Sequence, residues 1–164
     1  MELSNRNVNM EKKITSQSVE QTQQLAAALA DRLSRPALLA ISGRLGAGKT
    51  HFIKGLGPPL GIDPRNICSA TFVIMAEYGR EKRLVHVDAY RLKTPGELEN
   101  IGWYELLERP DVLIAVEWAD KITPLLPPHR LDIRIDILDD HRRNFVFTPR
   151  GPVYKSALKQ LTLD

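Results

Sequence analysis

A short apolar segment, ALLAIS at residues 37–42, leads directly into the glycine-rich segment GRLGAGKT at residues 43–50. The continuous apolar run is typical of a buried strand that is covered on both faces. Residues 48–56 have a helical pattern, which ends at GPPLG because proline cannot continue a helix. This order of strand, glycine-rich loop and helix restricts the chain to α/β folds and predicts a phosphate-binding loop.

The loop matches the pattern G-x-x-x-x-G-K-[ST], with its fixed positions at Gly43, Gly48, Lys49 and Thr50. Several backbone N–H groups must approach a phosphate at once, and side chains would block them, which favours glycine. The residue types therefore predict that Lys49 reaches the β- and γ-phosphate oxygens and that the Thr50 hydroxyl binds Mg²⁺.

Two carboxylates end apolar segments that we expect to be strands. Asp88 ends RLVHVD at residues 83–88, and Glu117 lies near the end of DVLIAVEW at residues 111–118. In a centrally parallel sheet both would lie at the edge that carries the phosphate-binding loop. An ATPase needs an acid there for Mg²⁺ and for the attacking water, and we expect functional roles for both.

The remaining pattern completes a P-loop NTPase-type α/β fold: a three-layer sandwich with a mixed, centrally parallel sheet and an antiparallel edge hairpin. We expect further helices over residues 18–34 and 94–108 and in the last ten residues. We expect further strands at residues 71–78, 131–138 and 145–149. Residues 1–13 are expected to be a flexible arm, and residues 14–164 one ATPase domain.

Composition excludes several classes of protein. The chain has 164 residues, no apolar run as long as the ~18 residues of a membrane span, and no apolar block behind its polar start. The only cysteine, Cys68, fits a reducing compartment, so a cytoplasmic location without membrane contact is expected. The net charge of +3 comes without a basic and aromatic cluster, which argues against a module that only binds RNA.

Five segments resemble the bacterial TsaE (YjeE) family in order and spacing: GRLGAGKT, ATFVIMAEY, HVDAYRL, ELENIGWYELL and VEWAD. The family consists of ATPases required to make threonylcarbamoyladenosine in tRNA. The resemblance spans roughly residues 14–138. It implies ATP/ADP and Mg²⁺ as cofactors, and the proteins TsaB and TsaD as partners, with tRNA contacted only indirectly through their complex.

The resemblance also assigns residues. It implies that the phosphates are held by Leu45, Gly46, Ala47, Gly48, Lys49 and Thr50. Thr50 and Glu117 would bind Mg²⁺, whereas the catalytic residues would be Lys49, Asp88 and Thr71. Asp88 matches an acid that binds Mg²⁺ through water or orients the attacking water. Thr71 matches a threonine that senses the γ-phosphate, Trp118 matches a tryptophan beside the metal glutamate, and residues 18–22 lie near the adenine in relatives.

Two departures from the family pattern stand out. Ala70 replaces a proline before Thr71, which relaxes the restriction on the preceding residue and predicts a more mobile loop. Pro58 and Pro59 shorten the helix after the P-loop. His86 alternates with valines, and we expect it to be a strand residue without a catalytic role.

The main hypothesis is thus a small Mg-dependent ATPase that resets partner proteins. The alternative is a small-molecule or nucleoside kinase in which Asp88 would act as base for an acceptor hydroxyl. Such kinases usually carry an arginine-rich lid, and residues 94–130 hold no obvious arginine cluster. The sequence also lacks the N-K-x-D segment with which GTPases bind guanine, which favours adenine.

Overall fold

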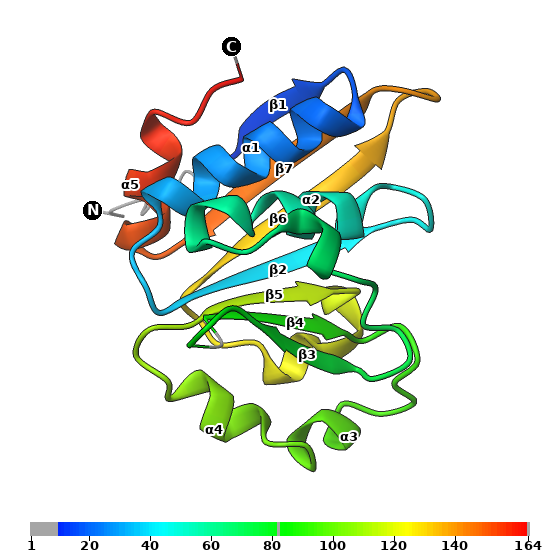
Figure 1. The fold of residues 1–164 in the computed structure, drawn as a ribbon, viewed down its shortest axis with the longest axis vertical. Helices are drawn as coiled ribbons and strands as arrows, with labels where there is room; N and C mark the ends of the chain where they lie inside the picture. The colour runs from blue at the N-terminus through cyan, green and yellow to red at the C-terminus, as the bar shows by residue number, and fades with distance from the viewer. Residues whose placement is uncertain (1–9, 82, 164) are drawn as a thin grey trace, which may run out of the picture.

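The computed structural model describes residues 10–81 and 83–163 and contains one mixed sheet between two layers of helices (Figure 1). Its strands are β1 Lys12–Ser16, β2 Ala37–Gly43, β3 Met75–Tyr78, β4 Leu84–Asp88, β5 Leu113–Glu117, β6 Arg130–Ile137 and β7 Arg143–Arg150. Its helices are α1 Val19–Arg32, α2 Lys49–Gly55, α3 Gly96–Glu99, α4 Trp103–Leu107 and α5 Pro152–Lys159. The 3₁₀ helices within these described residues are η1 Pro58–Leu60, η2 Pro64–Asn66 and η3 Ala119–Leu125.

The strand order is β1-β7-β6-β2-β5-β4-β3. β2 runs parallel to β5 and β6, and β4 runs parallel to β5. The pairs β6–β7, β7–β1 and β4–β3 are antiparallel. The expected α/β class with a centrally parallel sheet is confirmed. Antiparallel strands occur at both edges, however, and β1 lies outside the predicted hairpin.

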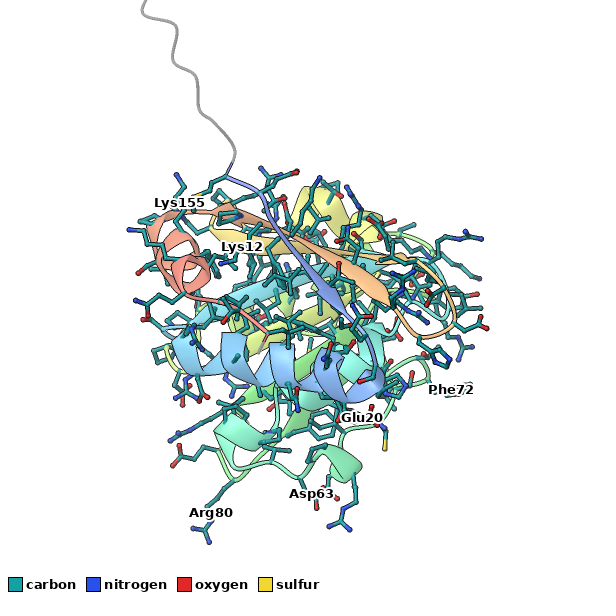
Figure 2. All side chains as sticks on the ribbon, turned by 90° about the horizontal axis from the view of Figure 1, so that it is seen from above. Lys12, Glu20, Asp63, Phe72, Arg80 and Lys155 are labelled. Carbon is teal, nitrogen blue, oxygen red and sulfur yellow. The ribbon has the colours of Figure 1, made fainter. Side chains whose placement is uncertain are left out.

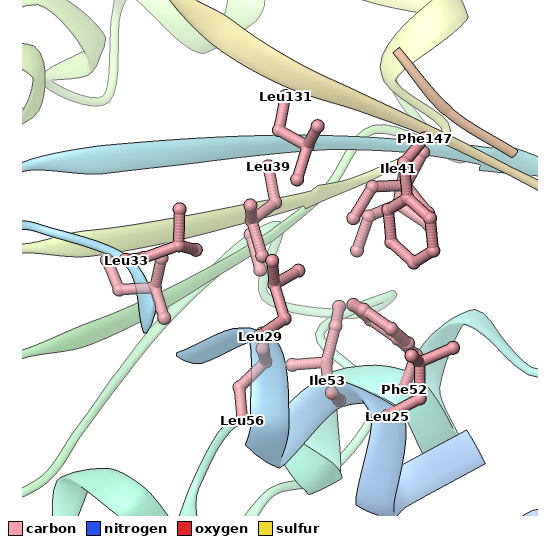
Figure 3. Close-up of a cluster of buried hydrophobic side chains, with 14 of the residues drawn as sticks. Leu25, Leu29, Leu33, Leu39, Ile41, Phe52, Ile53, Leu56, Leu131 and Phe147 are labelled. Atoms are coloured by element: carbon pink, nitrogen blue, oxygen red, sulfur yellow. The ribbon is translucent and has the colours of Figure 1, made fainter. Parts of the chain in front are cut away.

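Each face of the central strands packs into its own core. In β2, Leu39 and Ile41 face α1 and α2, whereas Leu38 and Ala40 face the side of α3, α4 and η3. Figure 3 shows Leu39 and Ile41 directed toward the side chains of α1 and α2. The largest buried side chain of the second core, Trp103, donates its indole N–H to the Leu125 carbonyl at 3.0 Å. Burial on both faces explains why this segment is apolar throughout.

The first helix begins where the sequence predicts. The Ser18 side chain accepts a hydrogen bond from the amide of Gln21 at 3.1 Å, and the Gln21 side chain accepts one from the Gln17 amide at 2.8 Å. The first bond satisfies an amide group that the first helical turn leaves unpaired, and the second ties the Gln21 side chain to the residue before the N-cap. They fix the start of α1 beside the P-loop.

Three sequence expectations are corrected. Residues 12 and 13, assigned to the flexible arm, pair with β7 as part of β1, whereas residues 1–9 of that arm lie outside the described residues. The strand expected over residues 71–78 begins only at Met75, because a tight turn precedes it. The helix expected over residues 94–108 divides into α3 and α4 at Gly102, where the backbone is left-handed with φ 91°.

Within residues 10–81 and 83–163, none of the helices combines the length and the apolar composition that a membrane crossing requires.

Candidate nucleotide site

The loop between β2 and α2 forms the floor of a pocket at the carboxyl ends of the parallel strands. Gly46 and Gly48 have φ angles of +80° and +96°, which side chains rarely allow, and no atom lies within 4 Å of a Cβ built on either glycine. Both residues thus leave open space above the backbone. This is the arrangement expected of a loop that receives a phosphate group.

Lys49 begins α2 and is buried, although it carries a charge. Its ammonium group donates to the carbonyls of Gly43 at 2.7 Å and Arg44 at 3.0 Å, and it lies 4.0 Å from the centre of the Trp118 ring. Burial lowers the pKa of Lys49, whereas the carboxylates of Glu117 and Asp88 act in the opposite direction. An ammonium group has three donors, so the two carbonyls leave one for a ligand.

Asp88 and Glu117 are register partners in the parallel pair β4–β5, which brings both acids to the same edge of the sheet. Both are buried, with 2% and 4% of their surface exposed. The Thr50 hydroxyl donates to Glu117 Oε1 at 2.7 Å. Asp88 Oδ2 accepts from the Thr71 hydroxyl at 2.8 Å, and Asp88 Oδ1 accepts from the Tyr90 amide at 2.9 Å.

One pocket of about 390 Å³ collects nearly all of the residues named from the sequence. Its lining includes Leu45, Gly46, Gly48, Lys49, Thr50, Thr71, Asp88, Glu117 and Trp118. Ala47 is the exception among the candidates. Its side chain is fully buried, and its amide donates to the Arg44 carbonyl at 3.0 Å within the loop.

Thr71 enters the pocket from a turn that the sequence did not predict. The amides of Val73 and Ile74 both donate to the Ala70 carbonyl, at 3.1 and 2.7 Å, and Ile74 has a left-handed φ of 67°. The turn directs Thr71 toward Asp88 and leaves Phe72 on the surface, where Figure 2 shows it at the margin of the molecule. Ala70, at the position of the family proline, lies buried at the base of this turn.

A second pocket of about 310 Å³ adjoins the first, since Gly46, Gly48 and His51 line both. Its other walls come from the start of α1 (Ser18, Val19, Glu20 and Thr22) and from Ala47, Asp140, His141 and Arg143. The Arg143 guanidinium donates to the carbonyls of Ala47 at 3.1 Å and Gly46 at 3.2 Å. Sequence reasoning missed Arg143, because nothing in the segment HRR at residues 141–143 indicates that β7 passes beside the P-loop.

Sequence reasoning also missed the position of His86. It faces the same side of β4 as Asp88, and its Nε2 lies 3.1 Å from Glu117 Oε1. The alternation around it located the strand correctly, but not the acid that its side chain contacts.

Thr50 and Glu117 offer oxygen ligands of the kind that Mg²⁺ prefers. Adjacent ligands of an octahedral Mg²⁺, at roughly 2.0–2.1 Å from the ion, lie about 2.9 Å apart. The Thr50 and Glu117 oxygens are 2.7 Å apart, which is close to this spacing. Among the described residues, no cluster of three or more His, Cys, Asp or Glu could hold a metal by itself. The Thr50 hydroxyl and the Glu117 carboxylate thus fit two ligand positions of a Mg²⁺ ion.

This fold and this loop define the class: the protein is an α/β protein of the P-loop type. Comparison with known proteins specifies it further. A family model described as threonylcarbamoyl adenosine biosynthesis protein TsaE matches residues 16–145. The chain belongs to the TsaE family, which is involved in the biosynthesis of threonylcarbamoyladenosine in tRNA.

Individual members of the family are similar to this chain over most of its length. The TsaE protein of Bacillus subtilis is 39% identical over 126 residues, which cover 76% of this chain and 77% of that protein. The TsaE protein of Rickettsia felis is 34% identical over 125 residues, covering 76% and 72%. The crystal structure of YdiB from Bacillus subtilis matches with a TM-score of 0.74 and 32% identity, covering 93% of this chain and 94% of that one.

Proposed function

We propose that this chain is a Mg-dependent ATPase that supports threonylcarbamoyladenosine modification of tRNA by cycling a TsaB–TsaD complex through ATP binding and hydrolysis. The observation that carries the proposal is the meeting of Lys49, Thr50, Asp88 and Glu117 in one pocket above two open glycines. Membership of the TsaE family supports the part of the proposal that concerns threonylcarbamoyladenosine biosynthesis. In this proposal the protein acts in the cytoplasm.

The two adjoining pockets suggest how the nucleotide lies. The phosphates would occupy the pocket lined by Lys49 and Glu117, and the base would occupy the pocket between the start of α1 and Arg143. The shared wall at Gly46 and Gly48 would then follow the phosphate chain. This placement agrees with the expectation that residues 18–22 lie near adenine.

The chain's own groups have distinct tasks in this proposal. The Lys49 ammonium neutralises charge on the phosphates with its remaining donor. Thr50 and Glu117 would hold a Mg²⁺ ion, which would supply positive charge that stabilises the transferring phosphoryl group. Asp88 uses its free lone pairs to orient the attacking water, and Thr71 reports on the γ-phosphate through its hydrogen bond to Asp88.

The turn at residues 70–74 connects the nucleotide site to the protein surface, where a partner protein could detect hydrolysis. Thr71 contacts Asp88 inside the pocket, whereas the next two side chains, Phe72 and Val73, are exposed. Loss of the γ-phosphate would change what holds Thr71, and therefore the position of Phe72 and Val73. A partner that contacts them would respond to the nucleotide state.

The test is ATP turnover with Mg²⁺, measured with and without purified TsaB and TsaD. We expect slow hydrolysis by the chain alone, faster hydrolysis with both partners, and loss of the rate in Lys49→Ala. The proposal fails if TsaB and TsaD neither bind nor change the rate. Transfer of phosphate to a small acceptor instead of water would indicate the kinase alternative.

A further inference from the structure

His86 lies wholly buried behind the candidate metal ligand. Its Nε2 is 3.1 Å from Glu117 Oε1, and both side chains are shielded from solvent. Within the described part of the chain, its other ring nitrogen, Nδ1, is buried without a hydrogen-bond partner. A buried polar atom of this kind is costly and calls for an explanation.

The tautomer follows from the contact. An ionised carboxylate only accepts hydrogen bonds, so a neutral His86 must carry its proton on Nε2 to bond with Glu117. Nδ1 is then a bare acceptor. The protein thus tolerates one unsatisfied nitrogen while it keeps the hydrogen bond to Glu117.

Two donors converge on the same oxygen of Glu117 from different parts of the fold. Thr50 approaches from α2 at 2.7 Å, and His86 approaches from β4 at 3.1 Å. Thr50 is the last residue of the phosphate-binding segment, where a bound ligand would compete for its hydroxyl. His86 lies in an interior strand, paired with Ala76 of β3 and Ala115 of β5. The sheet therefore fixes His86, whatever occupies the pocket.

We propose that His86 is a positioning residue: it holds the Glu117 carboxylate in the orientation that receives the divalent cation. This inference rests on the proposed function, because the cation and the nucleotide belong to that proposal. His86 touches neither of them and acts only through Glu117. Partners of metal ligands in this position typically change metal affinity about 10–100-fold when they are removed.

The test compares His86→Gln with His86→Asn. The Gln amide nitrogen can reach the position of Nε2 and donate to Glu117, whereas the shorter Asn cannot. Calorimetry with ADP, in Mg²⁺ and in EDTA, separates the metal-dependent from the metal-free affinity. We expect Asn to weaken ADP binding in Mg²⁺ about tenfold or more. We expect Gln to stay close to the wild type, and metal-free binding to be equal in all three proteins.

Other results overturn the inference. If both variants keep the wild-type Mg²⁺ dependence, His86 does not position Glu117. If both lose metal-free ADP binding to the same extent, His86 supports the fold and not the carboxylate. If the wild type itself binds ADP equally with and without Mg²⁺, the proposed function fails first.

A second measurement needs neither nucleotide nor variant activity. Proton–nitrogen NMR of the wild-type imidazoles without nucleotide reports which ring nitrogen carries the proton, and the signals missing from His86→Gln identify residue 86. We expect the Nε2–H tautomer. The Nδ1–H tautomer would mean that Glu117 receives no hydrogen bond from His86 and would overturn the inference, even if the Asn variant does not fold.

Discussion

Lys49 and Thr50 are neighbours in sequence, but they connect the P-loop to different partners. Lys49 turns back to the carbonyls of Gly43 and Arg44, while Thr50 reaches across to Glu117 on β5. One residue therefore stabilises the shape of the loop, and the other joins the loop to the sheet. Substitutions of Lys49 and of the Thr50 partner Glu117 should therefore have different effects: the first should weaken binding of the phosphates, and the second should weaken binding of the metal ion.

Replacing Lys49 with alanine should weaken ADP binding roughly 10–100-fold, because hydrogen bonds from charged donors contribute about 1.5–3 kcal/mol. The sheet should remain folded, since the ammonium mainly contacts loop carbonyls. Calorimetry and circular dichroism measure the two effects. Lys54→Ala, near the other end of α2, is the matched control and should bind normally. Normal hydrolysis by Lys49→Ala would remove the loop from consideration as the site.

Replacing Glu117 with alanine should reduce ADP affinity in Mg²⁺ more than ADP affinity in EDTA. The reason is that the carboxylate is proposed to contact the cation and not the phosphates. Glu117→Gln keeps the size of the side chain but removes its charge, and it should show the same selective loss. Titration of ADP at several Mg²⁺ concentrations measures this. An equal loss with and without metal would contradict the assigned role.

Tyr154 offers a stability test far from the site. The buried Leu38 amide donates to its phenolic oxygen at 2.9 Å. Tyr154→Phe leaves this amide unsatisfied and should lower the free energy of unfolding by about 1–3 kcal/mol, measured by urea denaturation.

Burial raises the pKa of Tyr154, so the unfolded chain loses its phenol proton first as pH rises above 10. Wild-type stability should therefore fall more steeply than that of Tyr154→Phe above pH 10.

At the scale of elements, the sequence was most informative where a strand is buried on both faces. The segments that became β2, β4 and β5 are short apolar runs, and two of them end in the acids of the site. Parallel pairing of these strands was enough to predict that Asp88 and Glu117 lie at the same edge of the sheet. The contacts Thr50–Glu117 and Thr71–Asp88 connect side chains 67 and 17 residues apart, and only the assembled sheet defines them.

The errors have local physical causes. In residues 94–108 the apolar spacing is helical on both sides of Gly102, but its left-handed backbone reorients the chain. In residues 71–78 the run is rich in strand-forming residues, yet the bonds from Val73 and Ile74 to Ala70 favour a turn. The strand β1 is short and polar, and it is defined by its pairing with β7 and not by its own pattern.

The crossing of α1 and α2 depends on Gly55. A Cβ at this position would lie 2.4 Å from the Gln23 carbonyl oxygen and 2.8 Å from the Ala26 Cβ. Gly55→Ala should therefore destabilise the protein by about 1–3 kcal/mol, measured by chemical denaturation. Gly96→Ala in α3 is the matched control, because its Cβ would meet nothing closer than 3.9 Å. We expect the control to be neutral or slightly stabilising, and equal effects would exclude close packing as the cause.

At the scale of the whole molecule, the two adjoining pockets join distant parts of the chain. Their walls come from the start of α1, the P-loop, the ends of β4 and β5, and the β6–β7 turn. A ligand that contacts all of these should stabilise the fold as a unit, since binding to the folded state alone shifts the unfolding equilibrium.

Mg-ATP at about 100 times its dissociation constant should add about 2.7 kcal/mol of stability. For a chain of this size, that corresponds to a rise in melting temperature of about 5–10 °C. Mg-GTP at the same concentration should produce a smaller shift, because the absence of an N-K-x-D segment favours adenine. Scanning fluorimetry measures both, with Lys49→Ala as the control whose shift should be reduced to about half of the wild-type shift or less. If Lys49→Ala keeps the full shift, the nucleotide binds elsewhere, and the apolar pocket of about 410 Å³ between Pro36 and Tyr154 becomes the next position to test.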